Sequence, residues 1–300
     1  MPLVAIDERT RVSDVPEREP ERPSGRDVVA HFLRREVKSI AHHEPLAREG
    51  ADSEGVHQLR VSARRMRSEL RAMRDVLPRE PWRDLGEDLK WMGTTLGRLR
   101  DLDVLAELFE VHLTPGSTLH TAVITVLDER RSMSRREVDG LLASRRYGRL
   151  VKRLTRLSRH PEMGDVGDTS AAELFLPSLW DAVGTYLATI GNPHDHRSDE
   201  SLHRVRIASK KCRYNFEVAT LYAGERARVV AESLEAIQTI LGLVQDRSVA
   251  VKFLDSLELE LDADLEVRRA LRAEIVELRP QWIVHFHRVQ RDVLGVFVRD

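Results

Sequence analysis

One irregular pattern of histidine and basic residues occurs twice in this chain. The segment from His57 reads HQLRVSARRMR, and the segment from His203 reads HRVRIASKKCR. Both have the form H-x-x-R-x-x-x-[KR]-[KR]-x-R, with the same spacing throughout. A second element, L-G-x-x-x-D, follows in both halves, at residues 96–101 and 241–246. Two matched elements in the same order predict an internal duplication.

The duplication predicts an all-α chain of two related helical bundles. Charged residues make up 32% of the chain and aromatic residues only 5%, which is typical of long amphipathic helices rather than of a β-sandwich. Pro161, Gly164 and Gly167 lie among acidic residues and indicate a linker between the bundles. We therefore expect a disordered tail at 1–26, a first bundle at 27–159, a linker at 160–169 and a second bundle at 170–300. Within the first bundle, helices are expected near 27–42, 54–77, 84–110 and 117–157, the last of them broken.

Both motif helices should present a basic stripe beside an apolar one. At about 100° per residue, the core-facing positions fall on a separate arc of each helix. They are Leu59, Ala63, Met66, Leu70, Met73 and Leu77 in the first helix, and Val205, Ser209, Cys212, Phe216 and Ala219 in the second. Cys212 lies on the core arc of the second helix and is interpreted as a small core residue. The basic stripe of the first helix comprises His57, Arg60, Arg64, Arg67, Arg71 and Arg74. That of the second comprises His203, Arg206, Lys210 and Arg213.

The stacked bases indicate an anionic partner. The formal net charge is −1, so attraction for a polyanion depends on where the charges lie. Like charges at i,i+4 repel one another, and solvated helices usually mix both signs. Arginine suits phosphate through its planar bidentate fork, and lysine adds a point charge.

These residues resemble the CHAD family, the conserved histidine α-helical domain. The resemblance rests on residues 56–67, 96–104, 202–214 and 241–246, and extends over nearly the whole chain from about Asp27. It implies two pseudo-symmetric four-helix bundles with a basic central cavity that binds inorganic polyphosphate. Some members carry an additional triphosphate-processing domain, for which we expect no room in this chain.

Carried over by position, the resemblance assigns both basic helices to polyphosphate. Lys90 and Arg100 are interpreted as supplementary contacts. Glu217, Glu235 and Gln245 stand where Arg71, Lys90 and Arg100 predict bases, which favours a dominant first half. The assigned residues are His57, Arg60, Arg64, Arg65, Arg67, Arg71, Arg74, Lys90, Arg100, His203, Arg206, Lys210, Lys211 and Arg213.

Two other functions are compatible with some of the same residues. The basic helices could neutralise a nucleic-acid backbone, although the first has no aromatic residue for base stacking. Glu-x-x-His occurs at His57 and His203 with the spacing of di-iron bundles, but helix capping explains the acids. Asp101 and Asp246 are interpreted as ion-pair partners of the basic helices, with Gly97 and Gly242 allowing close approach.

No phosphate-binding glycine loop or activated nucleophile is visible in the sequence. We therefore expect a binding protein rather than an enzyme, without cofactor or metal; a metal-dependent phosphohydrolase is the least favoured alternative. The single cysteine and the charged N-terminus, without a membrane span, predict a cytoplasmic protein. Polyphosphate granules are expected partners alongside free polyphosphate.

Overall fold

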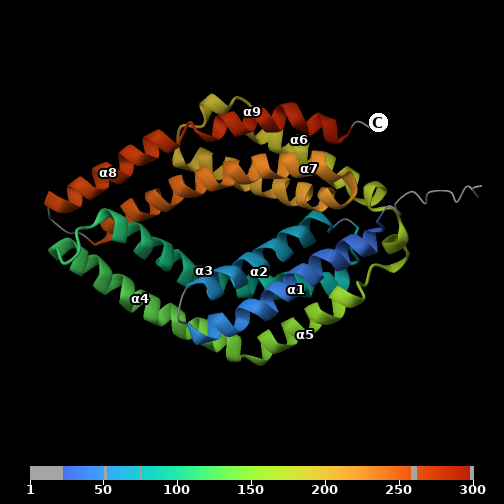
Figure 1. Cartoon of the computed structure of the whole chain (residues 1–300), viewed down its shortest axis with the longest axis horizontal. Helices are drawn as coiled ribbons and strands as arrows, with labels where there is room; N and C mark the ends of the chain where they lie inside the picture. Colours follow the sequence, from blue (N-terminus) through green and yellow to red (C-terminus); the bar gives the residue numbers. More distant parts are fainter. Residues whose placement is uncertain (1–22, 51–52, 75, 258–261, 298–300) are drawn as a thin grey trace, which may run out of the picture.

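The computed structural model describes residues 23–50, 53–74, 76–257 and 262–297, and these are almost entirely helical (Figure 1). Within those ranges no β-strand forms, and an isolated bridge joins Ser24 to Ser170. The predicted all-α class is confirmed. The α-helices are α1 (Gly25–Glu49), α2 (Glu54–Ala72), α3 (Arg79–His112), α4 (Thr118–Ala143), α5 (Arg145–Arg159), α6 (Ala171–Ile190), α7 (Asp199–Ser256), α8 (Asp262–Leu278) and α9 (Trp282–Asp292).

Several helix ends differ from the predicted ones. α1 continues past His42 to a left-handed C-cap at Gly50, whose N–H donates to the Leu46 carbonyl. α2 stops at Ala72 rather than at residue 77, because the chain turns at Met73. The predicted break in 117–157 lies at Ser144, where extended backbone separates α4 from α5. The hydroxyl of Ser144 then caps α5 by accepting from the backbone N–H of Tyr147.

The predicted linker packs against the start of α1. Residues 164–168 form a short 3₁₀ helix, and the Arg26 side chain donates to the carbonyls of Pro161 and Gly164. The Gly25 N–H donates to the Thr169 carbonyl at 2.9 Å. α1 thus begins at Gly25, within the stretch 1–26 that was expected as a tail. The remainder of that tail, 1–22, lies outside the described residues.

Buried apolar residues form three clusters. One joins α1, α2, α5 and the first part of α3, and another joins α6, α7 and α9. The third joins the end of α3 and the start of α4 to the end of α7 and to α8. Every predicted core position of the motif helices is buried, Cys212 included. The duplication itself, with its boundaries at 159 and 170, stays a prediction.

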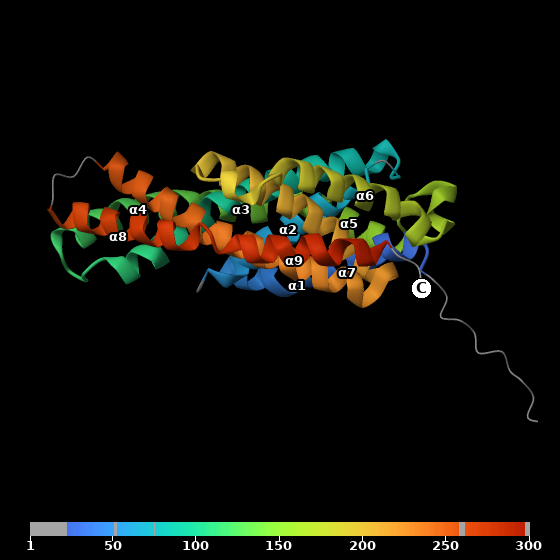
Figure 2. The same ribbon diagram turned by 90° about the horizontal axis from the view of Figure 1, so that it is seen from above.

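The helices run roughly along one long axis (Figure 2). α7 is interrupted at Gly224, whose φ of 59° and ψ of −136° are not helical, and a glycine adopts such a conformation without a Cβ clash. α2 packs against α7, so the two motif helices lie face to face. Each of these helices begins a few residues before the histidine of its motif, α2 at Glu54 and α7 at Asp199. None of the described helices is long and apolar enough to cross a membrane.

Candidate anion-binding cavity

A cavity of about 490 Å³ opens between α2 and α7. Basic side chains from both helices line it, together with polar ones from the later part of α7. The cavity therefore brings parts of both sequence motifs together. Its lining residues are His57, Gln58, Val61, Arg64, Arg65, Arg206, Lys210, Arg213, Glu235, Gln238 and Thr239.

α2 faces the cavity on a side rotated from the predicted basic stripe. His57, Arg64 and Arg65 line the cavity with Val61, and at about 100° per residue this side lies roughly a quarter turn from the centre of the stripe. Arg60 turns toward α3 instead, where it pairs with Asp101 at 2.9 Å. This is the side of α2 that meets Arg206, Lys210 and Arg213 of α7 across the cavity.

α7 contributes its predicted stripe more directly. Arg206, Lys210 and Arg213 line the cavity, whereas His203 is exposed and stands outside it. Glu235, Gln238 and Thr239 come from the segment of α7 beyond Gly224. The sequence comparison had singled out Glu235, because it stands where Lys90 of the first half predicts a base. No motif in the sequence indicated Gln238 or Thr239.

The remaining predicted residues lie elsewhere. Arg100 is largely buried and pairs with Glu107 at 2.6 Å. Arg67 is half-buried, and burial and then the neighbouring Arg71 lower the pKa of its guanidinium. Four further bases are exposed and do not line the cavity: Arg71, Arg74, Lys90 and Lys211. Arg74 lies beyond the end of α2, which explains its departure from the stripe.

The cavity holds more positive charge than its own carboxylates neutralise. Within the part of the chain that the structure describes, Arg64, Arg65 and Arg206 form no ion pair with a carboxylate. The Nε atoms of Arg64 and Arg65 and the Nδ1 atom of His57 are buried without a hydrogen-bond partner. Buried polar nitrogens without partners are costly. An anion in the cavity would supply the missing acceptors.

Burial and the crowding of positive charge lower the pKa of two side chains of the cavity, Lys210 and His57. Burial, followed by repulsion from Arg64 and Arg206, lowers the pKa of Lys210 to about 7. Burial and then the Arg100 guanidinium lower the pKa of His57 below its usual range. Both shifts have the sign expected for cations crowded together out of water. A bound polyanion would reverse them.

Arg213 is the exception, since its charge is already neutralised. It is only 4% exposed, and it pairs with Glu217 at 3.2 Å and with Glu235 at 2.7 Å. Its guanidinium also lies over the Tyr214 ring, 5.2 Å from the centroid. Arg213 therefore does not lie on the exposed side of its helix. Glu217 and Glu235 are its ion-pair partners, and Glu235 also lines the cavity.

The glycine and aspartate of the L-G-x-x-x-D element have different surroundings at its two occurrences. The interpretation of Asp101 as an ion-pair partner is confirmed by its contact with Arg60. Burial raises the pKa of Asp246, and Arg206 opposes that rise. A Cβ at Gly97 would lie 3.6 Å from Nε of Arg60, but at Gly242 it would meet nothing within 4 Å. The expected close approach at Gly242 is therefore wrong.

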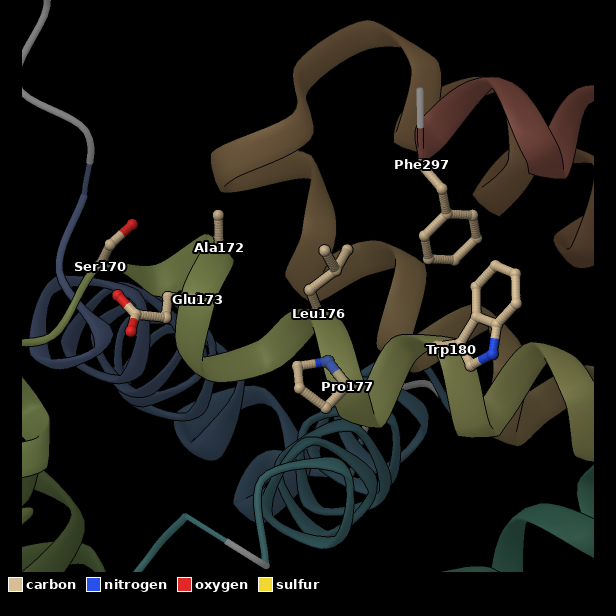
Figure 3. A pocket seen from close by; sticks show the side chains of 7 residues that line it. All are labelled: Ser170, Ala172, Glu173, Leu176, Pro177, Trp180 and Phe297. Carbon is tan, nitrogen blue, oxygen red and sulfur yellow. The ribbon is translucent and has the colours of Figure 1, made fainter. Parts of the chain in front are cut away.

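A second hollow, on the outer side of α6, has the opposite character (Figure 3). It has a volume of about 630 Å³ and includes Leu176, Pro177 and Trp180 in its walls. The Trp180 and Phe297 rings meet edge to face with centroids 4.6 Å apart. Glu173 is the charged residue of this lining. The hollow therefore suits a polyanion far less than the cavity between α2 and α7.

No group of three or more His, Cys, Asp or Glu side chains that could hold a metal ion gathers in the described ranges. At the first Glu-x-x-His, Glu54 accepts a hydrogen bond from Gln58 at 2.7 Å. At the second, the hydroxyl of Ser198 accepts from the Ser201 N–H and caps α7. The predicted capping is therefore present at the start of α7, whereas at the start of α2 Ser53 makes no side-chain capping hydrogen bond.

Known proteins share this architecture. The CHAD domain model matches residues 31–255, and the chain therefore belongs to the CHAD domain family. The crystal structure of the CHAD domain from the plant Ricinus communis is similar at 26% identity, with a TM-score of 0.69 over 93% of both chains. PptA from Streptomyces chartreusis shares the fold at 17% identity, with a TM-score of 0.62 over 90% of this chain and 99% of its own.

Two relatives from Mycobacterium tuberculosis are also similar. They are named uncharacterized protein MT2285 and uncharacterized protein Rv2226, from two strains. Each is 29% identical over 220 residues, which cover 67% of this chain and 40% of the relative. The matched region thus represents less than half the length of these relatives.

Proposed function

We propose that this chain binds inorganic polyphosphate in the cavity between α2 and α7 and does not change it chemically. The observation that carries the proposal is a set of basic side chains that face one another there and have no carboxylate partner among the described residues: Arg64 and Arg65 from α2, and Arg206 and Lys210 from α7. Polyphosphate presents a closely spaced row of anionic oxygens, which matches several cations around one opening. Membership of the CHAD family supports the same ligand.

The geometry favours a phosphate chain over most other anions. Guanidinium groups bind phosphate oxygens in pairs, and two helices facing each other can hold a chain from both sides. Among the described residues, no Phe, Tyr or Trp side chain lines the cavity to stack a base. Glu235 on its wall gives the α7 side a weaker net attraction than the α2 side. We therefore infer that α2 contributes more to affinity.

The deciding experiment is a titration with long-chain polyphosphate monitored by calorimetry. The double variant Arg64→Glu, Arg65→Glu should lose at least about a hundredfold in affinity, because reversing two cations of the cavity also introduces repulsion. A matched control, Arg269→Glu with Arg272→Glu, reverses two exposed bases on α8 and should change affinity by less than about threefold. Equal losses from both variants would refute the cavity as the binding site.

Three further measurements distinguish polyphosphate binding from nucleic-acid binding and from catalysis. Affinity for polyphosphate should fall steeply with added salt, as release of counterions requires. Competition with single- and double-stranded DNA should displace polyphosphate only at much higher concentrations. Shortening of the polyphosphate chain during incubation with Mg²⁺ or Mn²⁺ would contradict the non-catalytic part of the proposal.

A further inference from the structure

α5 is the most one-sidedly charged helix of the chain. Its fifteen residues, RRYGRLVKRLTRLSR, include seven bases and no acid. The whole chain, by contrast, has 48 basic and 49 acidic residues. Such a segment is unusual in a protein of near-zero net charge, and neither sequence motif includes it.

The helix presents its bases on one outer face. Tyr147, Leu150, Leu154 and Leu157 are buried in the first apolar cluster. The opposite side carries bases at i, i+4, i+7, i+11 and i+14, which fall within an arc of roughly 80° and extend over about 21 Å of helix. All five are exposed: Arg145, Arg149, Lys152, Arg156 and Arg159. We call them the α5 basic face.

Most of the α5 basic face has no acidic partner. Arg156 pairs with Glu162. Within the described residues, however, the other four members form no ion pair. Arg146, just beside the face, pairs with Asp88 at 2.7 Å and lies over the Trp91 ring. Like charges at i,i+4 repel one another, and an external anion would relieve that repulsion.

α1 extends this positive surface. The Nε of Arg34 donates to the Ser158 carbonyl at 3.0 Å, while the hydroxyl of Tyr147 donates to Glu44 at 2.9 Å. These contacts fix the two helices in an antiparallel register, with exposed Arg34 and Lys38 alongside α5. α1 and α2 lie between α5 and α7 (Figure 1). The α5 basic face is therefore separate from the cavity.

We propose that the α5 basic face is a second polyphosphate-binding surface, which holds a further stretch of a chain whose first stretch occupies the cavity. The inference rests on the proposed function of the cavity. A linear polyanion fits a straight row of cations, and the aromatic residue of α5, Tyr147, is buried and gives no platform for a base. Two sites on one polymer raise the affinity for long chains by effective concentration, without affecting short ones.

The test compares short and long ligands on the full chain. The variant Arg145→Glu, Arg149→Glu, Lys152→Glu breaks no ion pair of the described residues, and the acid at position 145, in the first turn of α5, favours the helix dipole. The control Arg269→Glu, Arg272→Glu, Arg288→Glu makes the same change in net charge on α8 and α9, again at exposed positions. Circular dichroism verifies that both are folded. Affinities for tripolyphosphate, for long-chain polyphosphate and for duplex DNA are then measured by calorimetry.

The α5 variant should lose at least about tenfold in affinity for long chains while keeping wild-type affinity for tripolyphosphate. The control should retain both within about threefold. Equal long-chain affinities of the α5 variant and the control would overturn the inference and leave the cavity intact. Failure of the wild type to bind either ligand would refute the proposed function itself. Loss of duplex DNA binding alone in the α5 variant would assign the face to nucleic acid and overturn the inference.

Discussion

At the scale of single residues, Lys210 links the cavity to pH. Its pKa of about 7 arises from burial and from Arg64 and Arg206 nearby, so the side chain is partly neutral at physiological pH. A bound polyanion favours the ammonium form and raises this pKa. Binding therefore takes up a proton above pH 7, and affinity should fall as pH rises from 7 to 9. Below pH 7 Lys210 is already charged, and it contributes no further change.

Replacing Lys210 with arginine should flatten this dependence. Arginine stays charged throughout this range, so the variant should bind with nearly constant affinity from pH 7 to 9. The wild type should weaken by up to about tenfold per pH unit, the limit for one proton. Calorimetry in buffers of different ionisation enthalpy would measure the proton uptake directly. Parallel pH profiles for the two proteins would show that Lys210 does not titrate on binding.

Side-chain direction could be predicted from the sequence for the core but only in part for the site. The period of 3.6 residues placed Met66, Leu70 and Cys212 correctly in the interior, because the arc that a helix turns to the core is visible in its own sequence. It did not distinguish Arg65, which lines the cavity, from Arg67, which does not. That choice depends on which side of α2 contacts α7. The pairing of Arg213 with Glu235 likewise depends on the interruption of α7 at Gly224, which no local pattern indicated.

At the scale of elements, the crossing of α1 and α2 depends on Gly55. A Cβ at this position would lie 2.3 Å from the backbone nitrogen of Ala47 and 2.7 Å from the carbonyl carbon of Leu46. Backbone atoms cannot move aside as a flexible side chain would. The start of α2, and with it His57 two residues later, is therefore positioned by this close contact with α1.

Gly55→Ala should destabilise the fold by at least about 2 kcal/mol, the usual scale of overpacking. Gly148→Ala in α5 is the matched control, because a Cβ added there would have no other atom within 4 Å. That change should stabilise the protein by about 0.5–1 kcal/mol through reduced entropy of the unfolded chain. Urea unfolding monitored by circular dichroism measures both. Similar stability of the two variants would show that α1 shifts to admit the methyl group.

At the scale of the whole molecule, the basic surfaces are embedded in a chain without excess positive charge. Three apolar clusters hold the helices together, and the interface of α2 with α7 gathers cations whose repulsion the fold must offset. The sequence motifs predicted that both basic helices serve one ligand. They did not predict the α5 basic face, because it belongs to neither motif.

The most direct test of the cavity as the binding site is a crystal structure of this chain with bound polyphosphate. We expect phosphate density between α2 and α7, with oxygens within hydrogen-bond distance of Arg64, Arg65, Arg206 and Lys210. The unpartnered Nε atoms of Arg64 and Arg65 should then have acceptors. An ordered phosphate chain bound elsewhere, with the cavity free of phosphate at saturating ligand, would contradict polyphosphate binding between these two helices.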